Sequence, residues 1–279
     1  MNPDFFTNGN TVYTPTEQRM IDSICQNYTD FSYLTIGQLA AQLGVSEATV
    51  SRFVRHAGYS DFKEMRAALL SAHASETPAG KLSQTLQETK SGSVADIFTR
   101  QQQYLQKTLL YLDDAQMEAA VSAVLGAKNI YLYGKGASAG LAQIFAFRLN
   151  RFGIAVHLLP SGGSEIFEQL VNITADDLVI VFGFQKTPRE AAVLLNHKKE
   201  AGYGTILITS RLYQEENLPA DIRLFVYRGE NQEYHSMTTA MTLVDALVLL
   251  TAQRMESASF EKLSRLYRLK EKYRHDIPR

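Results

Sequence analysis

Two glycines and a serine in the stretch YLYGKGASAG, residues 131–140, have the types and spacing expected of a phosphate-binding loop. Gly134 and Gly136 follow an apolar run typical of a β-strand, and Ser138 opens the helical pattern that comes next. Glycines let the backbone approach an anion closely, and the free N–H groups at a helix N-terminus favour phosphate. The sequence therefore predicts a ligand loop formed by Gly134, Lys135, Gly136 and Ser138.

Other interpretations of this loop remain open. The spacing Gly134-x-Gly136-x-x-Ala139 satisfies a loose dinucleotide fingerprint, but the next strand ends in HLLPSGG without the carboxylate that would hold a ribose. A Walker loop needs four residues between its first glycine and Gly-Lys, which this segment lacks. The glycines could also serve only a tight strand-to-helix turn. A small phosphorylated ligand is the favoured interpretation.

Two further loops are expected to reach the same crevice, because open parallel sheets bind ligands beyond the carboxyl ends of their strands. Residues 161–164 contribute hydroxyls, and residues 183–187 contribute polar groups and a positive charge. These loops offer neither an aromatic cage nor a metal-ligand cluster, so the sequence predicts no cofactor and no metal ion. The candidate ligand residues in the two loops are Ser161, Ser164, Gln185, Lys186 and Thr187.

A second motif, LAAQLGVSEATVSRFVRH at residues 39–56, has the pattern of a helix-turn-helix. Ala40 is the small residue inside the first helix, Gly44 supplies the turn, and Val50 locks the second helix onto the first. The outer face of that second helix would fit the major groove of DNA, although an ordinary helical hairpin with solvated charges is the alternative. The candidates for base contacts are Glu47, Ala48, Thr49 and Arg52, and those for phosphate contacts are Ser46, Ser51, Arg55 and His56.

Charge alone does not decide whether DNA is the partner. The net charge of the chain is −1, and residues 1–75 hold more acidic than basic residues, although most of the basic ones fall between residues 52 and 66. One copy is therefore expected to bind DNA weakly, whereas a two-fold dimer would double the phosphate contacts. The helix over residues 138–151 is apolar or small on nearly every side, so we expect it to pack between its own sheet and another subunit.

The elements that position the two motifs divide the chain into an all-α domain at residues 1–75, a polar linker at 76–93 and an α/β domain at 94–279. In the second domain, five apolar runs alternate with helical stretches, as in a parallel sheet that is covered on both faces. These runs are IYLYG, IAVHLLP, DLVIVFGF, TILITS and IRLFVY. In the first domain, N-caps are predicted at Thr14 (with Glu17), Thr35 (with Gln38), Ser46 and Ser60.

Bulk composition excludes several classes of protein. The 279 residues are 45% hydrophobic and 20% charged, which is enough apolar material for roughly two ordinary domains. No apolar run reaches the ~20 residues that cross a bilayer, and the first ten residues lack a secretory pattern, so we expect a cytoplasmic protein. The single cysteine, Cys25, cannot form an internal disulfide.

Both motifs resemble those of the RpiR/MurR-type bacterial transcription regulators. Residues 1–75, with LAAQLGVSEATVSRFVRHAGYSDFKEMRAAL, are similar to the N-terminal helix-turn-helix domain. Residues 105–255, with IYLYGKGASAGLA and VIVFGFQKTPREAAVLL, are similar to the SIS (sugar isomerase) domain. The resemblance implies a SIS-like sheet of flavodoxin-like order. It also implies a dimeric regulator of sugar metabolism that binds a double-stranded DNA operator and senses a phosphorylated sugar, without enzymatic activity.

The loop after the third strand departs from the family pattern. Sugar-phosphate-binding members are rich in serine and threonine around a glycine at this loop, whereas this chain has GFQKTP at residues 183–188. Lys186 could replace the lost hydroxyls as a charge partner for phosphate. A different ligand, or a site that no longer binds one, is the alternative.

An aldose–ketose isomerase, or a bifunctional protein, is the competing function because SIS folds also serve as isomerases. Such an enzyme needs a carboxylate or imidazole within reach of its substrate. Glu230, Glu233 and His235, just before the last long apolar helix, are the candidates, and they equally suit a solvated loop. An isomerase would have no use for a DNA-binding hairpin.

Overall fold

A computed structural model of the chain describes residues 13–14, 16–17, 20–21, 24, 34–68, 77–89, 92–184, 187–211, 218–230 and 232–277. The chain divides into two compact units. One comprises Met1–Lys90 with Glu230–Tyr234, and the other comprises Ser91–Gly229 with His235–Arg279.

Capping signals build the N-terminal unit largely as the sequence predicts. Helix α2 (Ile36–Leu43) begins with a capping box in which the Gln38 N–H donates to Thr35 Oγ1 at 3.3 Å and the Thr35 N–H donates to Gln38 Oε1 at 2.9 Å. Gly44, at φ 65°, ends α2 in the left-handed conformation that favours glycine. Helix α3 (Glu47–His56) then starts from its N-cap Ser46. The predicted helix-turn-helix geometry is therefore confirmed.

The N-cap predicted at Ser60 is wrong. Helical residues begin at position 62, and Asp61 caps them, since its Oδ1 accepts the Glu64 N–H at 2.8 Å. Ser60 instead donates to the Glu64 carboxylate, from its N–H at 2.6 Å and from its hydroxyl at 2.5 Å. The Asp61 carboxylate is anionic and lies one residue closer to the helix, so it meets the positive helix terminus better than a serine hydroxyl would.

Helix α5 (Pro78–Glu88) lies within the segment that the sequence assigned to a linker. Thr77 caps it by accepting the Gly80 N–H at 3.0 Å, and Pro78 occupies the first turn, where its missing N–H costs nothing. The same unit holds the segment Glu230–Tyr234, whose Tyr234 N–H donates to Thr85 Oγ1 at 2.8 Å. The linker segment thus contains a capped helix with a contact of its own.

The second unit contains a parallel sheet of five strands in the order β2-β1-β3-β4-β5. Both the α/β class and the flavodoxin-like order predicted for it are confirmed. The order in which the strands are added reverses between β1 and β3, since β2 lies on one side of β1 and β3 lies on the other. The strands are β1 (Ile130–Tyr133), β2 (Val156–Leu158), β3 (Leu178–Phe182), β4 (Gly204–Thr209) and β5 (Ile222–Phe225).

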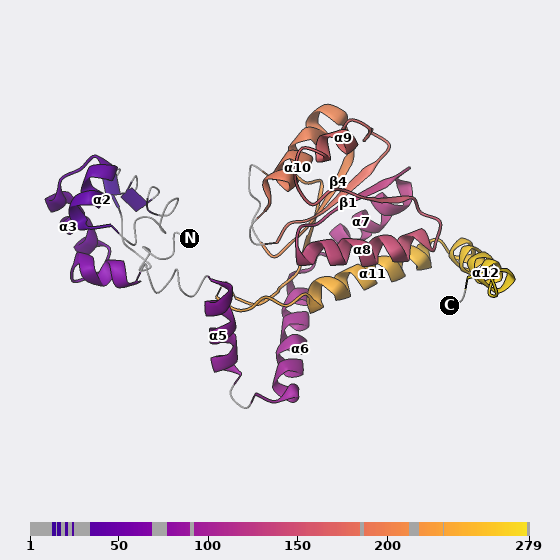
Figure 1. Cartoon of the computed structure of the whole chain (residues 1–279), viewed down its shortest axis with the longest axis horizontal. Helices are drawn as coiled ribbons and strands as arrows, with labels where there is room; N and C mark the ends of the chain where they lie inside the picture. The colour runs from indigo at the N-terminus through magenta and orange to yellow at the C-terminus, as the bar shows by residue number, and fades with distance from the viewer. Residues whose placement is uncertain are drawn as a thin grey trace. The chain divides into compact units, whose positions relative to one another are not determined.

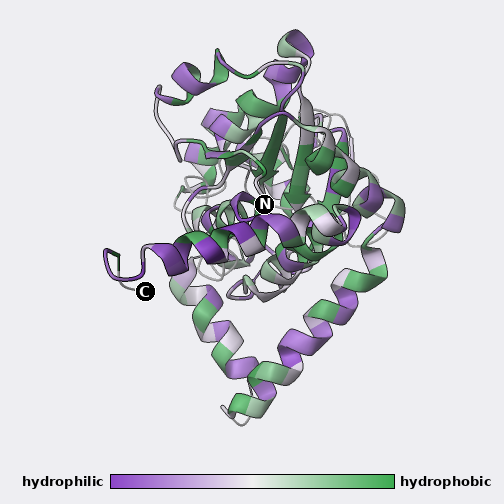
Figure 2. Ribbon diagram, turned by 90° about the vertical axis from the view of Figure 1, so that its right-hand side faces the viewer, coloured by the Kyte–Doolittle hydropathy of each residue, from purple (hydrophilic) through white to green (hydrophobic). Residues whose placement is uncertain are grey.

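Helices cover both faces of the sheet, with α8 and α11 on one side and α9 and α10 on the other (Figure 1). The buried residues accordingly form two clusters, one around Phe145 and Leu247 and one around Tyr133 and Leu194. The strands are hydrophobic over nearly their whole length (Figure 2), as strands buried on both faces must be. The helices of the unit are α6 (Val94–Tyr111), α7 (Asp114–Gly126), α8 (Ala137–Asn150), α9 (Ile166–Leu170), α10 (Arg189–Ala201), α11 (Thr238–Arg254) and α12 (Ser257–Lys272).

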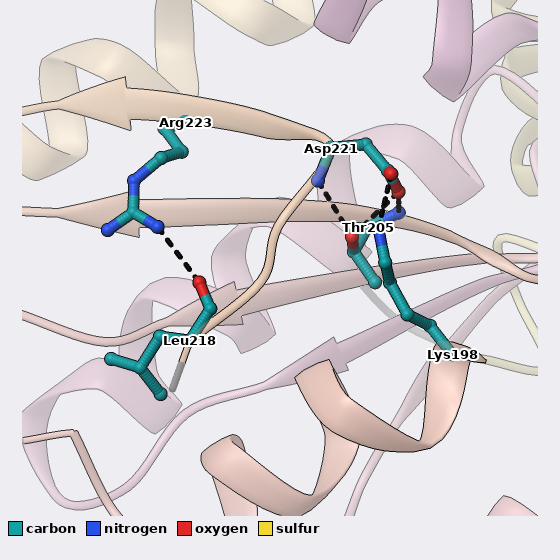
Figure 3. Close-up of polar contacts among 5 residues, drawn as sticks. All are labelled: Lys198, Thr205, Leu218, Asp221 and Arg223. Carbon is teal, nitrogen blue, oxygen red and sulfur yellow. Dashed lines mark hydrogen bonds and ion pairs between the residues drawn. The ribbon is translucent and has the colours of Figure 1, made fainter. Parts of the chain in front are cut away.

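Carboxylates fix the amino edge of the sheet. Asp221, just before β5, accepts the N–H and the hydroxyl of Thr205 at 2.8 Å each and forms an ion pair with Lys198 (Figure 3). Asp177, just before β3, binds the side chain of Asn129 at 2.8 Å. Burial alone would raise the pKa of both carboxyls, but hydrogen bonds outweigh it and lower each pKa, those from Thr174 and Asn129 for Asp177 and those from Lys198 and Thr205 for Asp221. Both groups are engaged in holding strand ends together.

In the part of the chain that the structure describes, none of the helices combines the length and the apolar character that a membrane span requires.

Candidate DNA-binding face and ligand site

The outer face of α3 carries exposed side chains, whereas its inner face belongs to the apolar core of the N-terminal unit. Val50, Phe53 and Val54 are buried on the inner side against α2 and the helix at residues 62–68. Arg52 and Arg55 are exposed on the other side, and Thr49 and Ser51 are half-buried at the margins. A helix anchored in this way presents one stripe of side chains to a partner.

Local contacts position four of the candidate DNA-binding side chains. Ser46 Oγ accepts the Thr49 N–H at 3.2 Å and lies 2.8 Å from Thr49 Oγ1, so both hydroxyls are used in starting α3. Thr49 Oγ1 also accepts from Arg52 Nη2 at 3.5 Å, which leans the guanidinium toward the helix N-terminus. Glu47 lies back over α2, where its Oε1 would come within 2.6 Å of a Cβ at Gly37.

His56 has a partner inside the unit. Its Nδ1 lies 2.7 Å from Oε1 of Glu17, and its ring packs against Tyr13 at 5.3 Å between centroids. Only Nε2 of the predicted phosphate-contacting imidazole is therefore left for DNA. The sequence pattern showed that His56 lies on the outer side of α3, but the distant partner Glu17 could not be inferred from it.

The first ligand loop follows β1 and makes the close turn that its glycines allow. A Cβ at Gly134 would lie 2.5 Å from the carbonyl oxygen of Ser138, so no side chain fits there. Gly136 is the N-cap of α8 at φ 61° and ψ −128°, a conformation that L residues rarely adopt. Ser138 is buried in the first turn of α8, and Lys135 is exposed.

Glu190, at the start of α10, ties the first loop to the opposite layer of helices. Its Oε1 accepts from Lys135 Nζ at 3.0 Å, and its Oε2 accepts from the Tyr133 hydroxyl at 3.3 Å. Hydrogen bonds from its own backbone N–H and from Lys135 lower the pKa of Glu190. Burial, with the nearby Glu190 charge, raises the pKa of the Tyr133 hydroxyl. The group is thus an ionised carboxylate that holds a cation and a neutral phenol.

The second loop meets the first at the same place. The Tyr133 hydroxyl also contacts the Ser161 carbonyl oxygen at 3.2 Å. A Cβ at Gly162 would lie 3.1 Å from Glu190 Oε1 and 3.5 Å from Lys135 Nζ. The side chains of Ser161 and Ser164 are exposed. The two loops therefore converge at the carboxyl ends of β1 and β2, beside the point where the strand order reverses.

Of the third loop, residues 183–187, the structure describes residues 183, 184 and 187. Gly183 lies close enough to Thr187 that a Cβ there would meet Thr187 Oγ1 at 3.6 Å. The Thr187 hydroxyl oxygen is buried without a hydrogen-bond partner among the described residues. Gln185 and Lys186, which the sequence also proposed for ligand binding, lie outside the described residues.

Sequence reasoning missed Glu190 and Tyr133. The signal was present in the segment TPRE, where an acid stands in the first turn of a helix just after a candidate ligand loop. Tyr133 was hidden inside an apolar strand, where its ring is fully buried and only its position at the strand end brings the hydroxyl to the loops.

The acids weighed for an isomerase have contacts of their own. The Glu233 side chain is buried, and its Oε2 accepts the Glu230 N–H at 3.1 Å. Both residues belong to the segment Glu230–Tyr234, which groups with the N-terminal unit. Among the described residues, the carboxylate that contacts the ligand loops is Glu190.

Comparison with known families accounts for both halves of the chain. Residues 7–76 match the family described as "Helix-turn-helix domain, rpiR family", and residues 124–250 match the family described as "SIS domain". The two matches span the candidate DNA-binding face and the three ligand loops. The chain belongs to the RpiR family of transcription regulators.

Two relatives that match most of this RpiR-family chain are named as transcriptional regulators. An uncharacterized HTH-type transcriptional regulator of Caldanaerobacter subterraneus is 25% identical over 246 residues, which cover 87% of each chain. The HTH-type transcriptional regulator HexR of Pseudomonas aeruginosa is 25% identical over 239 residues, covering 84% of this chain and 82% of HexR.

Solved structures share the RpiR-family fold. The sugar isomerase domain of an RpiR transcription factor from Sphaerobacter thermophilus matches 62% of this chain and 97% of its own, with a TM-score of 0.58 and 26% identity. The Vibrio vulnificus NanR protein, complexed with ManNAc-6P, matches 96% of this chain and 97% of its own, with a TM-score of 0.57. Its 21% identity makes this a likeness of fold.

Proposed function

We propose that this regulator senses a phosphorylated sugar at the carboxyl ends of β1, β2 and β3. The observation that carries the proposal is the convergence of the glycine loop and the 161–164 loop on Tyr133 and Glu190 at the switch point of a parallel sheet. Polar groups and closely approachable backbone there suit a small anionic molecule. The fold shared with NanR, whose structure is complexed with ManNAc-6P, gives further support.

The DNA operator is proposed to meet α3. Arg52 and Arg55 are exposed on the face opposite the buried Val50 and Phe53, which suits insertion into a major groove. Ser46, Glu47, Thr49, Ser51 and His56 complete the proposed contact set, and four of them, all but Ser51, have contacts within the unit. We place the DNA-binding domain at residues 1–75 and the ligand-sensing domain at 94–279.

The regulator is proposed to act as a dimer. Helix α8 packs on β1, β2 and α11 of its own chain, yet Ile144 and Phe147 on it are exposed, Phe147 by 61%. A second copy on this face would cover apolar area and align two α3 helices with a palindromic operator. Ligand binding would then shift the dimer between arrangements of different DNA affinity.

We infer a binding protein rather than an enzyme. The relatives that match most of the chain are named as transcription regulators, and Glu190, the carboxylate found at the ligand loops, is committed to Lys135 and Tyr133. A general base needs its carboxylate available to the substrate, whereas this one already accepts from two donors.

One experiment tests sensing, DNA binding and catalysis together. The full chain is titrated onto a labelled DNA fragment from its own upstream region, with and without members of a panel of sugar phosphates, while thermal melting reports ligand binding. We expect a shifted fragment, a raised melting temperature for one sugar phosphate and a changed DNA affinity with that compound. Turnover of a sugar phosphate without any DNA binding would contradict the proposal and favour an isomerase.

A further inference from the structure

Arg228 carries a positive charge into the carboxyl edge of the sheet. It lies three residues beyond the end of β5, and its guanidinium carbon sits 4.1 Å from the centroid of the Phe184 ring. Its Nε donates to the carbonyl oxygen of Ser236 at 2.9 Å. Phe184 belongs to the third ligand loop, so Arg228 brings a side chain from the end of β5 to the end of β3.

The described residues supply no counter-charge for this guanidinium. Its contacts there are the Phe184 ring and the Ser236 carbonyl, neither of which is anionic. Burial lowers the pKa of Arg228 to about 10, which still leaves the side chain protonated at neutral pH. A partly desolvated charge of this kind is costly unless an anion compensates it. Four of its five N–H donors have no described acceptor.

A second unsatisfied group lies in the third ligand loop, which also contains Phe184. The buried Thr187 Oγ1 has no hydrogen-bond partner among the described residues. It lies beside Gly183, where a Cβ would already meet Leu207 at 3.0 Å, so the loop is closely packed against β4. The Thr209 hydroxyl reaches the Phe184 carbonyl at 3.4 Å and holds the loop end in place. A buried hydroxyl without a partner is ordinarily satisfied by water or by a ligand.

We propose that Arg228, held over the Phe184 ring, binds an oxyanion of the effector, with Thr187 at the same carboxyl edge of the sheet. The inference rests on the proposed ligand-sensing function and adds a residue that lies outside the three ligand loops. A planar guanidinium presents paired donors that match the oxygens of a phosphate monoester or a carboxylate. Lys135 is paired with Glu190, so Arg228 is the cation at this edge whose described contacts leave its charge uncompensated.

The test follows binding of inorganic phosphate to the full chain by thermal melting, with chloride at matched ionic strength as the reference. Gluconate and glucose serve as carboxylate and neutral probes. The variants are Arg228→Gln, which removes the charge, and Arg228→Lys, which keeps it without the fork. Arg151→Gln is the matched control, because Arg151 also lies over a phenylalanine ring, Phe147 at 5.5 Å, but at the far end of α8.

We expect Arg228→Gln to weaken phosphate binding by about tenfold or more, the scale of a lost charge-assisted hydrogen bond, and Arg228→Lys to weaken it less. Arg151→Gln should match the parent. Without phosphate, Arg228→Gln should melt no lower than the parent, since it removes an uncompensated charge. A response to gluconate alone that Arg228→Gln abolishes would support the site with a carboxylate as its ligand.

Equal oxyanion binding by the parent and Arg228→Gln, or no oxyanion binding by the parent, would overturn the inference. A variant that melts lower yet binds phosphate as the parent does would show that Arg228 only supports the fold. Operator affinity measured on the same preparations separates this inference from the proposed function. If the parent binds DNA and responds to a sugar phosphate, and Arg228→Gln responds equally, only the role of Arg228 fails.

Discussion

The imidazole Nδ1 of His56 lies 2.7 Å from Oε1 of Glu17 and joins the end of helix α3 to a residue 39 positions earlier in the chain. Burial alone would raise the pKa of Glu17, but the hydrogen bonds from Thr14 and His56 outweigh it and lower that pKa. The pair therefore links the seating of α3 to the ionisation of one carboxyl group.

Acid should weaken the N-terminal unit through Glu17. Because the folded-state pKa is lowered, ionised Glu17 contributes stability that is present above its ordinary pKa of 4.5 and is lost as the pH falls through the folded value. We expect circular-dichroism melts to show this loss below pH 4.5 in the parent and a smaller one in Glu17→Gln. Glu47→Gln, on the exposed first turn of α3, is the control. The same acid dependence in Glu17→Gln and the parent would contradict the prediction.

Arg52→Ala should weaken operator binding by about 1–3 kcal/mol and leave the fold intact, because an exposed guanidinium early in α3 can pair with a guanine edge. Fluorescence anisotropy with the operator fragment measures the loss. Arg265→Ala, at an exposed position of α12 in the second unit, controls for the general effect of a lost positive charge. Unchanged affinity of Arg52→Ala would remove this residue from the proposed contact.

Val50→Asp should unfold the N-terminal unit, because Val50 is 0% exposed and the new carboxylate would have no partner in the apolar cluster. Ala48→Asp places the same side chain two residues away at an exposed position and should melt close to the parent. Circular dichroism distinguishes the two. Similar melting of both variants would mean that α3 is not anchored through Val50.

Phe147→Glu should convert the proposed dimer into a monomer, because it puts a charge in the centre of the exposed apolar face of α8. Within the helix the new carboxylate can pair with Arg151, four residues later, so the fold is preserved. Phe167→Glu is the control, since Phe167 is 56% exposed but lies on α9, across the sheet. Light scattering at micromolar concentration reads the mass. A dimeric Phe147→Glu chain would exclude this face.

Glu190→Gln should strengthen binding of inorganic phosphate by about two- to fivefold, the worth of one exposed ion pair, because it releases Lys135 and removes a repelling charge. Glu165→Gln removes an exposed charge just after the second loop and should have little effect. The same thermal titration applies. Weaker binding by Glu190→Gln would show that Glu190 serves the site by fixing Tyr133 rather than by restraining Lys135.

Local signals predicted the fold well where the deciding groups are close in sequence. The box of Thr35 and Gln38, the left-handed Gly44 and the continuous apolar strands all depend on neighbours within a few residues. The prediction of an N-cap at Ser60 was wrong for a reason that is also local. Ser60 and Asp61 are adjacent and could both cap the helix, and the anionic Asp61 occupies the N-cap position.

The ligand site was predictable only in outline. The backbone geometry of the glycine loop could be predicted from its glycines. Gly134 is required by a close approach to Ser138, and Gly136 is required by a positive φ. The contacts among Lys135, Tyr133 and Glu190 arise from the packing of α10 over the sheet and join residues up to 57 positions apart. No spacing rule relates such residues before the topology is known.

Helix α8 begins directly after its N-cap Gly136 in the glycine loop and carries the exposed Phe147 eleven residues beyond that cap. The two residues lie on one rigid helix, about 16 Å apart along its axis at 1.5 Å per residue. Since a Cβ at Gly134 would collide with Ser138, the loop and the helix start cannot move independently. A tilt of the glycine loop therefore moves the outer face of α8 as well, because the helix moves as one rigid body.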